Sequence, residues 1–145
     1  MQKSVASRTP ASFWIVSVLA LAWNSFGSVD FVLTNMRDQA YLSKFPVEII
    51  DWLDEMPLWA LAVWTIGVWG AVAGSLLLLL RSRFAVLAFA ASLAGLALST
   101  LYQVMGGVPP SMRTPETFVT TGMIWAGALF FVWYAVRSRR SGILR

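Results

Sequence analysis

The amino-acid sequence predicts an all-α membrane protein, a four-transmembrane-helix bundle with a short amphipathic external helix. Of the 145 residues, 58 % are hydrophobic and only 12 % are charged, whereas about a quarter of the residues in a soluble domain are charged. Four apolar stretches are each close to the roughly 20 residues that cross a bilayer. Basic and acidic residues fall in different connecting segments. We therefore expect one domain, residues 1–145, folded in lipid.

The four expected spans are residues 13–33, 57–80, 84–105 and 117–136. The second span starts behind Pro57, and the turn Arg81-Ser82-Arg83 separates it from the third. Because this turn is so short, the second and third spans must form an antiparallel hairpin. Helices satisfy their own backbone groups in lipid, and no ten-residue alternating pattern indicates a β-barrel.

Residues 46–56, between the first two spans, predict the short amphipathic helix, with Pro46 as its first helical residue. At 100° per residue the acidic and apolar side chains occupy opposite sides. The acidic side has Glu48, Asp51, Asp54 and Glu55, and the apolar side has Ile49, Ile50, Trp52, Leu53 and Met56. Its acidity argues against attraction to anionic headgroups, so packing against the bundle or a partner is expected in place of lipid binding. A connector without any binding role is the favoured interpretation over a binding surface.

The charges predict the orientation of the chain. Eight of the eleven Lys/Arg residues flank one end of the expected spans: Lys3, Arg8, Arg81, Arg83, Arg137, Arg139, Arg140 and Arg145. All seven acidic residues belong to the other end: Asp30, Asp38, Glu48, Asp51, Asp54, Glu55 and Glu116. By the positive-inside rule both termini are cytoplasmic. We expect a multi-pass protein of a bacterial inner membrane, with residues 137–145 as a basic cytoplasmic tail.

A cleavable signal peptide is a rival interpretation of the first span. Lys3 and Arg8 precede an apolar run that reaches the small-residue sequence Ala20-Leu21-Ala22, which resembles a cleavage site. The apolar stretch, however, continues to Leu33, which is the length of a span. We therefore expect the segment to be retained as a span.

Whole classes of chemistry are excluded by the residues that the chain lacks. It has no cysteine and no histidine, so thiolate nucleophiles, Cys/His zinc sites, iron–sulfur ligation and histidine acid–base catalysis are impossible. No nucleotide-binding glycine loop or nucleophile elbow is present. The basic residues form no stripe with interleaved aromatics, so nucleic acid is not an expected partner. We expect no enzyme activity, no cofactor and no metal site.

Polar side chains inside the spans are the candidate functional residues. A carboxamide or hydroxyl in lipid is expected to face another helix, or else a solute. The candidates are Ser17, Asn24, Ser28 and Asp30 in the first span and Ser92, Ser99 and Gln103 in the third. Asp30 is interpreted as an interface residue, with a gate at an outward-facing vestibule as the alternative, Asn24 lying deeper and Gln103 opposite.

Glycines in two spans predict close helix contacts. Gly67, Gly70 and Gly74 recur in the second span and Gly95 lies in the third. Small residues at such spacings allow helix backbones to approach closely. We expect these four positions to be packing contacts.

Several segments also resemble a known group of proteins: Leu21 to Gly27, Glu55 to Ala60, Gly74 to Val86 and Ser141 to Arg145. The chain is similar over nearly its whole length to uncharacterised bacterial four-transmembrane inner-membrane proteins often labelled "sugar transporter". The resemblance implies a four-span fold, and it supplies no established functional residues. Small sugar exporters have proline–glutamine pairs that this chain lacks, since Pro109-Pro110 lies outside the spans.

Two function classes follow. The first is an accessory or scaffold subunit that packs in a larger membrane assembly. The second is a facilitator for a small solute, for which the resemblance suggests a sugar, working as a homo-oligomer because four short helices rarely enclose an aqueous path. The absence of a charged coupling group near the expected midplane favours the first class.

Overall fold

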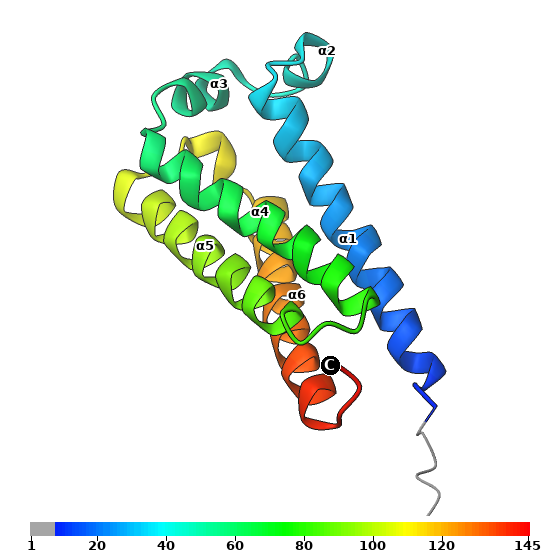
Figure 1. The fold of residues 1–145 in the computed structure, drawn as a ribbon. Helices are drawn as coiled ribbons and strands as arrows, with labels where there is room; N and C mark the ends of the chain where they lie inside the picture. The colour runs from blue at the N-terminus through cyan, green and yellow to red at the C-terminus, as the bar shows by residue number, and fades with distance from the viewer. Residues whose placement is uncertain (1–7) are drawn as a thin grey trace, which may run out of the picture.

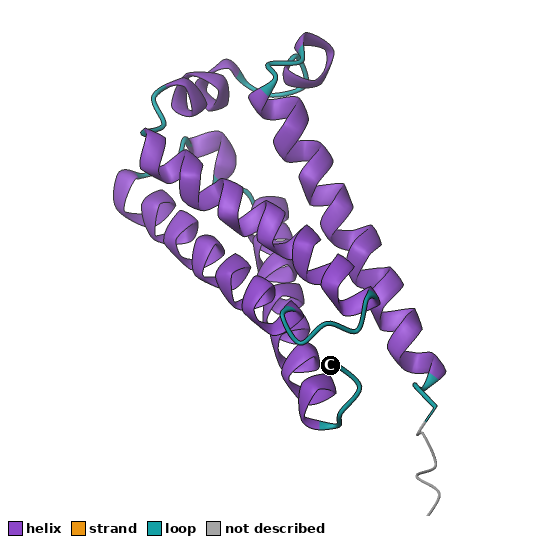
Figure 2. Ribbon diagram, in the orientation of Figure 1, coloured by secondary structure: helices purple, strands orange, loops and turns teal. Residues whose placement is uncertain are grey.

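The computed structural model describes residues 8–145 and consists of helices joined by short links (Figures 1 and 2). Four helices are long: α1 (Ala11–Asn35), α4 (Leu58–Leu79), α5 (Ala85–Gly106) and α6 (Pro115–Arg140). Two short helices, α2 (Gln39–Leu42) and α3 (Val47–Asp54), link α1 to α4, and the 3-10 helix η1 (Pro110–Met112) links α5 to α6. Residues 8–145 contain no β-strand. The predicted all-α fold class is confirmed.

The long helices have the length and the apolarity of membrane spans. They contain 25, 22, 22 and 26 residues, and their most apolar windows have mean hydropathies of 1.5 to 1.8. At about 1.5 Å per residue, even the 22-residue helices are about 33 Å long, which matches the roughly 30 Å hydrocarbon core of a bilayer. The chain is a multi-pass membrane protein by these criteria.

The helices pack in chain order, each antiparallel to its neighbour. Helix α4 lies between α1 and α5, and α6 packs against α5 (Figure 1). The chain therefore forms two ends, which we call the basic end and the acidic end after the charges of their connecting segments. Lys3, expected at the basic end, lies outside the described residues.

The best-packed part of the molecule lies at the basic end. Side chains from all four long helices and from the last residues of the chain form one cluster: Phe13, Ala20, Leu78, Ala85, Phe89, Phe131, Ala135 and Leu144. Next to Leu144, Arg145 makes two backbone hydrogen bonds to the α4–α5 turn, from Arg83 N–H to Arg145 O and from Arg145 N–H to Arg81 O. In the tail expected at residues 137–145, residues 137–140 therefore form the end of α6, and the last residues of the chain are hydrogen-bonded to the α4–α5 turn.

Helix α6 is longer than predicted because the first residue that favours the end of a helix, Gly142, lies beyond the apolar span. The helix begins at Pro115, with Thr114 as its N-cap, and continues four residues beyond the expected end at residue 136. Gly142, with a φ of +75°, adopts the left-handed conformation that commonly ends helices. The intervening arginines remain helical because they are good helix formers.

The amphipathic helix α3 caps the acidic end of the bundle. It begins at Val47, one residue after Pro46, so the expectation that Pro46 is the first helical residue is wrong. Pro46 has an extended ψ of 144° and serves as the N-cap. The four acidic side chains are exposed and the apolar side is half-buried, as predicted. The Trp52 indole donates a hydrogen bond to the Gly107 carbonyl at 3.1 Å and packs on Tyr102, so α3 is packed against the bundle.

Candidate functional site

Asn24 makes the main polar contact between α1 and α4. Its amide donates to the Ser75 hydroxyl at 2.9 Å and lies 3.4 Å from the Ala71 carbonyl. Ser75 is fully buried and itself donates to Ala71 O at 2.8 Å. Asn24 therefore joins the first span to the second, and its amide has its partners within the chain.

The other two α1 candidates bond within their own helix. Ser17 is fully buried and donates to Phe13 O at 2.8 Å, while Ser28 donates to Ser25 O at 2.8 Å. Such bonds satisfy a hydroxyl in lipid without joining two helices. The structure therefore does not bring Ser17, Asn24 and Ser28 together as one binding surface.

We predict that Asn24→Leu weakens the α1–α4 contact only modestly. The expected loss is about 0.6 to 2 kcal/mol, the usual range for a hydrogen bond between transmembrane helices, since Ser75 keeps its bond to Ala71 O. The measurement is the free energy of unfolding in detergent micelles, with Ser28→Ala as the control because its bond is local. Complete loss of the fold would contradict this prediction.

Asp30 bonds to the link that follows its own helix. The Tyr41 hydroxyl, in α2, donates a hydrogen bond to the Asp30 carboxylate. Partial burial, the hydrogen bond to Asp30 and the negative charge of Asp30, in that order, raise the pKa of Tyr41 to about 12. The contact fixes α2 on the end of α1. Asp30 is therefore a structural contact between α1 and α2 in this conformation.

The Tyr41–Asp30 contact predicts a loss of stability at high pH. A folded-state pKa of about 12 lies above the ordinary tyrosine value of about 10, so the stabilisation is complete below about pH 10 and disappears as the pH rises through 12. Tyr41→Phe should remove this pH dependence, and Asp30→Asn should lower the pKa of Tyr41. The measurement is a phenolate absorbance titration alongside unfolding at each pH; an unchanged profile in Tyr41→Phe would count against the contact.

The predicted glycines lie at the α4–α5 contact. A Cβ atom on Gly95 would be 2.6 Å from Gly67 N and 2.6 Å from Val63 O, and one on Gly70 would be 3.2 Å from the Ala88 carbonyl. Gly74 faces the Phe89 ring. The buried Ser92 hydroxyl donates to the Gly67 carbonyl at 2.5 Å. These residues hold two backbones together and leave no space for a solute between them.

Ser99 and Gln103 lie farther along α5, toward the acidic end. Within residues 8–145 neither of them forms a hydrogen bond with Asp30. In the same part of the chain the buried Ser99 hydroxyl has no hydrogen-bond partner, whereas its neighbour Thr100 accepts a hydrogen bond from the Trp125 indole at 3.2 Å. Gln103 is half-buried. Asn24 and Asp30 are bonded to Ser75 and Tyr41. The alternative in which Asp30, Asn24 and Gln103 form one vestibule stays a prediction.

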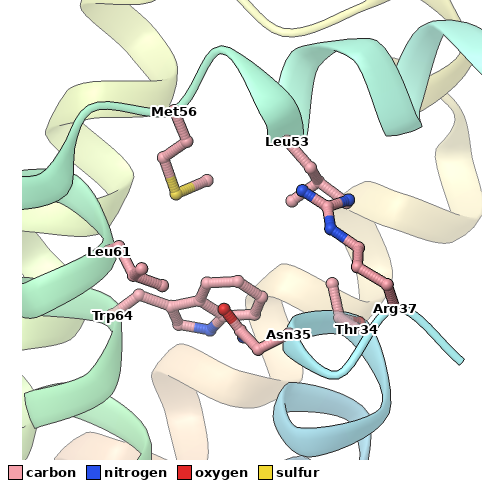
Figure 3. Close-up of a pocket in the computed structure, with 7 residues that line it drawn as sticks. All are labelled: Thr34, Asn35, Arg37, Leu53, Met56, Leu61 and Trp64. Atoms are coloured by element: carbon pink, nitrogen blue, oxygen red, sulfur yellow. The ribbon is translucent and has the colours of Figure 1, made fainter.

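A cavity of about 240 Å³ does open at the acidic end, between the end of α1, α3 and the start of α4 (Figure 3). It is lined by Thr34, Asn35, Arg37, Leu53, Met56, Leu61 and Trp64. Trp64 is held edge-on to the buried Phe31 ring, with 4.8 Å between centroids. Arg37 forms an ion pair with Asp54, which ties the α1–α2 link to α3 across the mouth.

The lining determines what the cavity can bind. It offers an indole face, a hydroxyl, a carboxamide and a guanidinium that already has a carboxylate partner. This combination suits a small neutral polar molecule, and the volume is slightly below the roughly 300 Å³ of typical ligand pockets. The lining has no general base or nucleophile with a base beside it.

The sequence interpretation placed Leu53 and Met56 on the apolar side of the amphipathic helix but did not identify Thr34, Asn35, Arg37 or Trp64 as lining residues of a cavity. Thr34 and Asn35 are adjacent polar residues at the end of an apolar run, a signal that could have placed them at a helix terminus, where Thr34 is buried and Asn35 is exposed. The roles of Arg37 and Trp64 depend on where α3 folds back, which the sequence does not specify.

Comparisons with protein-family models, with curated proteins and with solved structures gave no match. The resemblance to four-transmembrane proteins labelled "sugar transporter" therefore stays a prediction.

Proposed function

We propose that the protein is an accessory subunit that packs against a transmembrane helix of another polypeptide and catalyses no reaction. One observation supports this most. On α5, the side facing away from the bundle contains four exposed alanines, Ala90, Ala91, Ala94 and Ala97, which we call the alanine face. Ala90 and Ala94 have the four-residue spacing of small residues at which transmembrane helices approach closely.

The polar contacts of the spans support the same proposal. Ser17, Asn24, Ser75 and Ser92 all have hydrogen-bond partners inside the chain. Their roles are accounted for by packing, which is what a structural subunit needs. A transporter, in contrast, needs polar groups that are free to exchange their partners with a solute.

The proposed setting is a bacterial inner membrane, with the basic end in the cytoplasm. The arginines at that end, including Arg81, Arg139 and Arg140, follow the positive-inside rule. The acidic helix α3 would then cap the outer side, where its four exposed carboxylates are available to a partner's basic residues.

The test is purification in a gentle detergent followed by identification of bound chains. Wild type should retain one stoichiometric partner, and Ala94→Leu should lose it because the added side chain fills the space that the partner helix occupies. Ala73→Leu is the matched control, since Ala73 is an exposed alanine on α4. A homo-oligomer without another chain would overturn the proposal.

A solute facilitator is the second candidate, and the acidic-end cavity favours it. The Trp64 indole together with Thr34 and Asn35 would suit a small neutral polar solute such as a sugar. In one copy of the chain the cluster around Phe13, Leu78 and Phe131 fills the basic end, so a path would need several copies. Flux of labelled sugars into proteoliposomes that Trp64→Ala reduces would support this candidate, and no flux would remove it.

A further inference from the structure

A second cavity, of about 430 Å³, lies at the basic end on the outer surface of α5 and α6. Its lining residues are Arg83, Phe84, Val86, Leu87, Ala90 and Arg139. Two guanidinium groups, one from the α4–α5 turn and one from the last turn of α6, therefore border the same space. The other four side chains are apolar, and Phe84, Leu87 and Ala90 are exposed along the outside of the bundle.

The two arginines of this cavity have no acidic side chain beside them. All seven acidic side chains of the chain lie at positions 30–55 or at Glu116, which belong to the acidic end. Within residues 8–145 the ion pair is between Arg37 and Asp54, also at that end. The two positive charges beside this cavity repel each other. A bound anion would attract both and so offset the repulsion.

The position of the two arginines is set by the fold. Arg83 follows a turn in which Arg81 has a φ of +57°, and its own N–H donates to Arg145 O at 2.9 Å. Its guanidinium carbon lies 5.4 Å from the centre of the Phe84 ring. Arg139 lies on α6, which is fixed to α5 by the stacked rings of Phe89 and Phe131. The site is thus carried by packed elements.

We propose that this cavity binds an anionic phospholipid, with the headgroup phosphate between Arg83 and Arg139 and an acyl chain along Val86, Leu87 and Ala90. Arginine is suited to the phosphate because its planar guanidinium can donate two parallel hydrogen bonds. Basic pockets on the cytoplasmic side of transmembrane helices are suited to anionic headgroups. The proposal does not rest on the accessory-subunit proposal, although Ala90 belongs both to this lining and to the alanine face.

The apolar lining favours a lipid over free phosphate. A free phosphate ion would gain nothing from Val86, Leu87 and Ala90, which lead away from the two charges along α5 toward the lipid-facing surface. An amphiphile satisfies both parts of the cavity. Its headgroup meets the arginines and its hydrocarbon covers the apolar wall.

The test is a lipid titration of the full chain in detergent, followed by native mass spectrometry. Phosphatidylglycerol and phosphatidylcholine with the same acyl chains are compared on wild type, on Arg83→Gln/Arg139→Gln and on Arg137→Gln/Arg140→Gln. The last pair removes two charges from the same end but lies outside the cavity lining. Inorganic phosphate is added in a separate arm as a competitor.

The proposal expects wild type to bind one phosphatidylglycerol in preference to phosphatidylcholine. Arg83→Gln/Arg139→Gln should weaken this binding about thirty-fold, as expected for two arginines near an anionic headgroup, and the control pair should bind like wild type. Equal loss in both variants would overturn the proposal in favour of diffuse charge, and displacement of the lipid by millimolar phosphate would overturn it in favour of a free-anion site. If the cavity variant does not fold, headgroup preference and phosphate competition in wild type decide the question.

Discussion

Gly95→Ala should be among the most destabilising substitutions in this chain. The new methyl group would lie 2.6 Å from Gly67 N and from Val63 O, and 2.9 Å from Gly67 Cα. These are backbone atoms, so no side-chain rotation relieves the clash and α4 has to move away from α5. Overpacking usually costs about 1–3 kcal/mol, and we expect a loss of about 3 kcal/mol in the free energy of unfolding in detergent micelles.

The other glycines provide the controls for this experiment. A Cβ on Gly67 would come no closer than 3.4 Å to its neighbours, and one on Gly122 would meet nothing within 4 Å. Gly67→Ala should therefore be nearly neutral. Gly122→Ala should stabilise the protein by about 0.5–1 kcal/mol, the usual gain for alanine over glycine in a helix. Equal losses at Gly95 and Gly122 would contradict the close approach of α4 and α5 at Gly95.

The sequence was sufficient to predict the number and type of the long helices. Whether a segment is long and apolar enough to cross a bilayer depends on the residues of that segment alone. The helix α3 was also predictable, because its acidic and apolar sides alternate with the helical period. The boundary error at the end of α6 comes from a termination signal that lies beyond the apolar span, Gly142. The error at Pro46 arises because proline can stand either at the first helical position or just before it, and here it is the N-cap.

The partner of Asn24 could not be predicted. Serines lie at comparable depth in two other helices, Ser75 on α4 and Ser92 on α5, and both are chemically able to accept an amide. What selects Ser75 is the packing of α1 on α4, in which Phe31 meets Trp64 two turns away. Such packing depends on side-chain shapes along the whole contact and is not encoded by the polar residues themselves.

The alanine face of α5 was missed for a related reason. In a soluble helix, polar residues mark the outward side, but a membrane helix is apolar on all sides. Ala94 on the outer face and Ala88 on the inner face are therefore indistinguishable in the sequence. Only the positions of α4 and α6 show which alanines have no neighbour within the described part of the chain.

Leu78→Ala should destabilise the basic end by about 2 kcal/mol. Leu78 is fully buried in the cluster that also contains Phe13, Ala85 and Leu144. In soluble proteins such a truncation costs about 2–5 kcal/mol, as the sum of a transfer contribution and a cavity contribution. In a bilayer the transfer contribution is small because lipid is as apolar as leucine. The lost packing contacts remain, so the expected loss lies at the low end of that range.

The control for Leu78 lies two residues away in the sequence. Leu80 is 76 % exposed, so Leu80→Ala removes the same atoms without leaving a cavity and should change the free energy of unfolding by less than about 0.5 kcal/mol. Both variants are measured in the same detergent by reversible denaturation. Equal losses would mean that packing inside the cluster at the basic end contributes little and that the detergent holds the helices together. The expected difference would mean that this cluster stabilises the bundle.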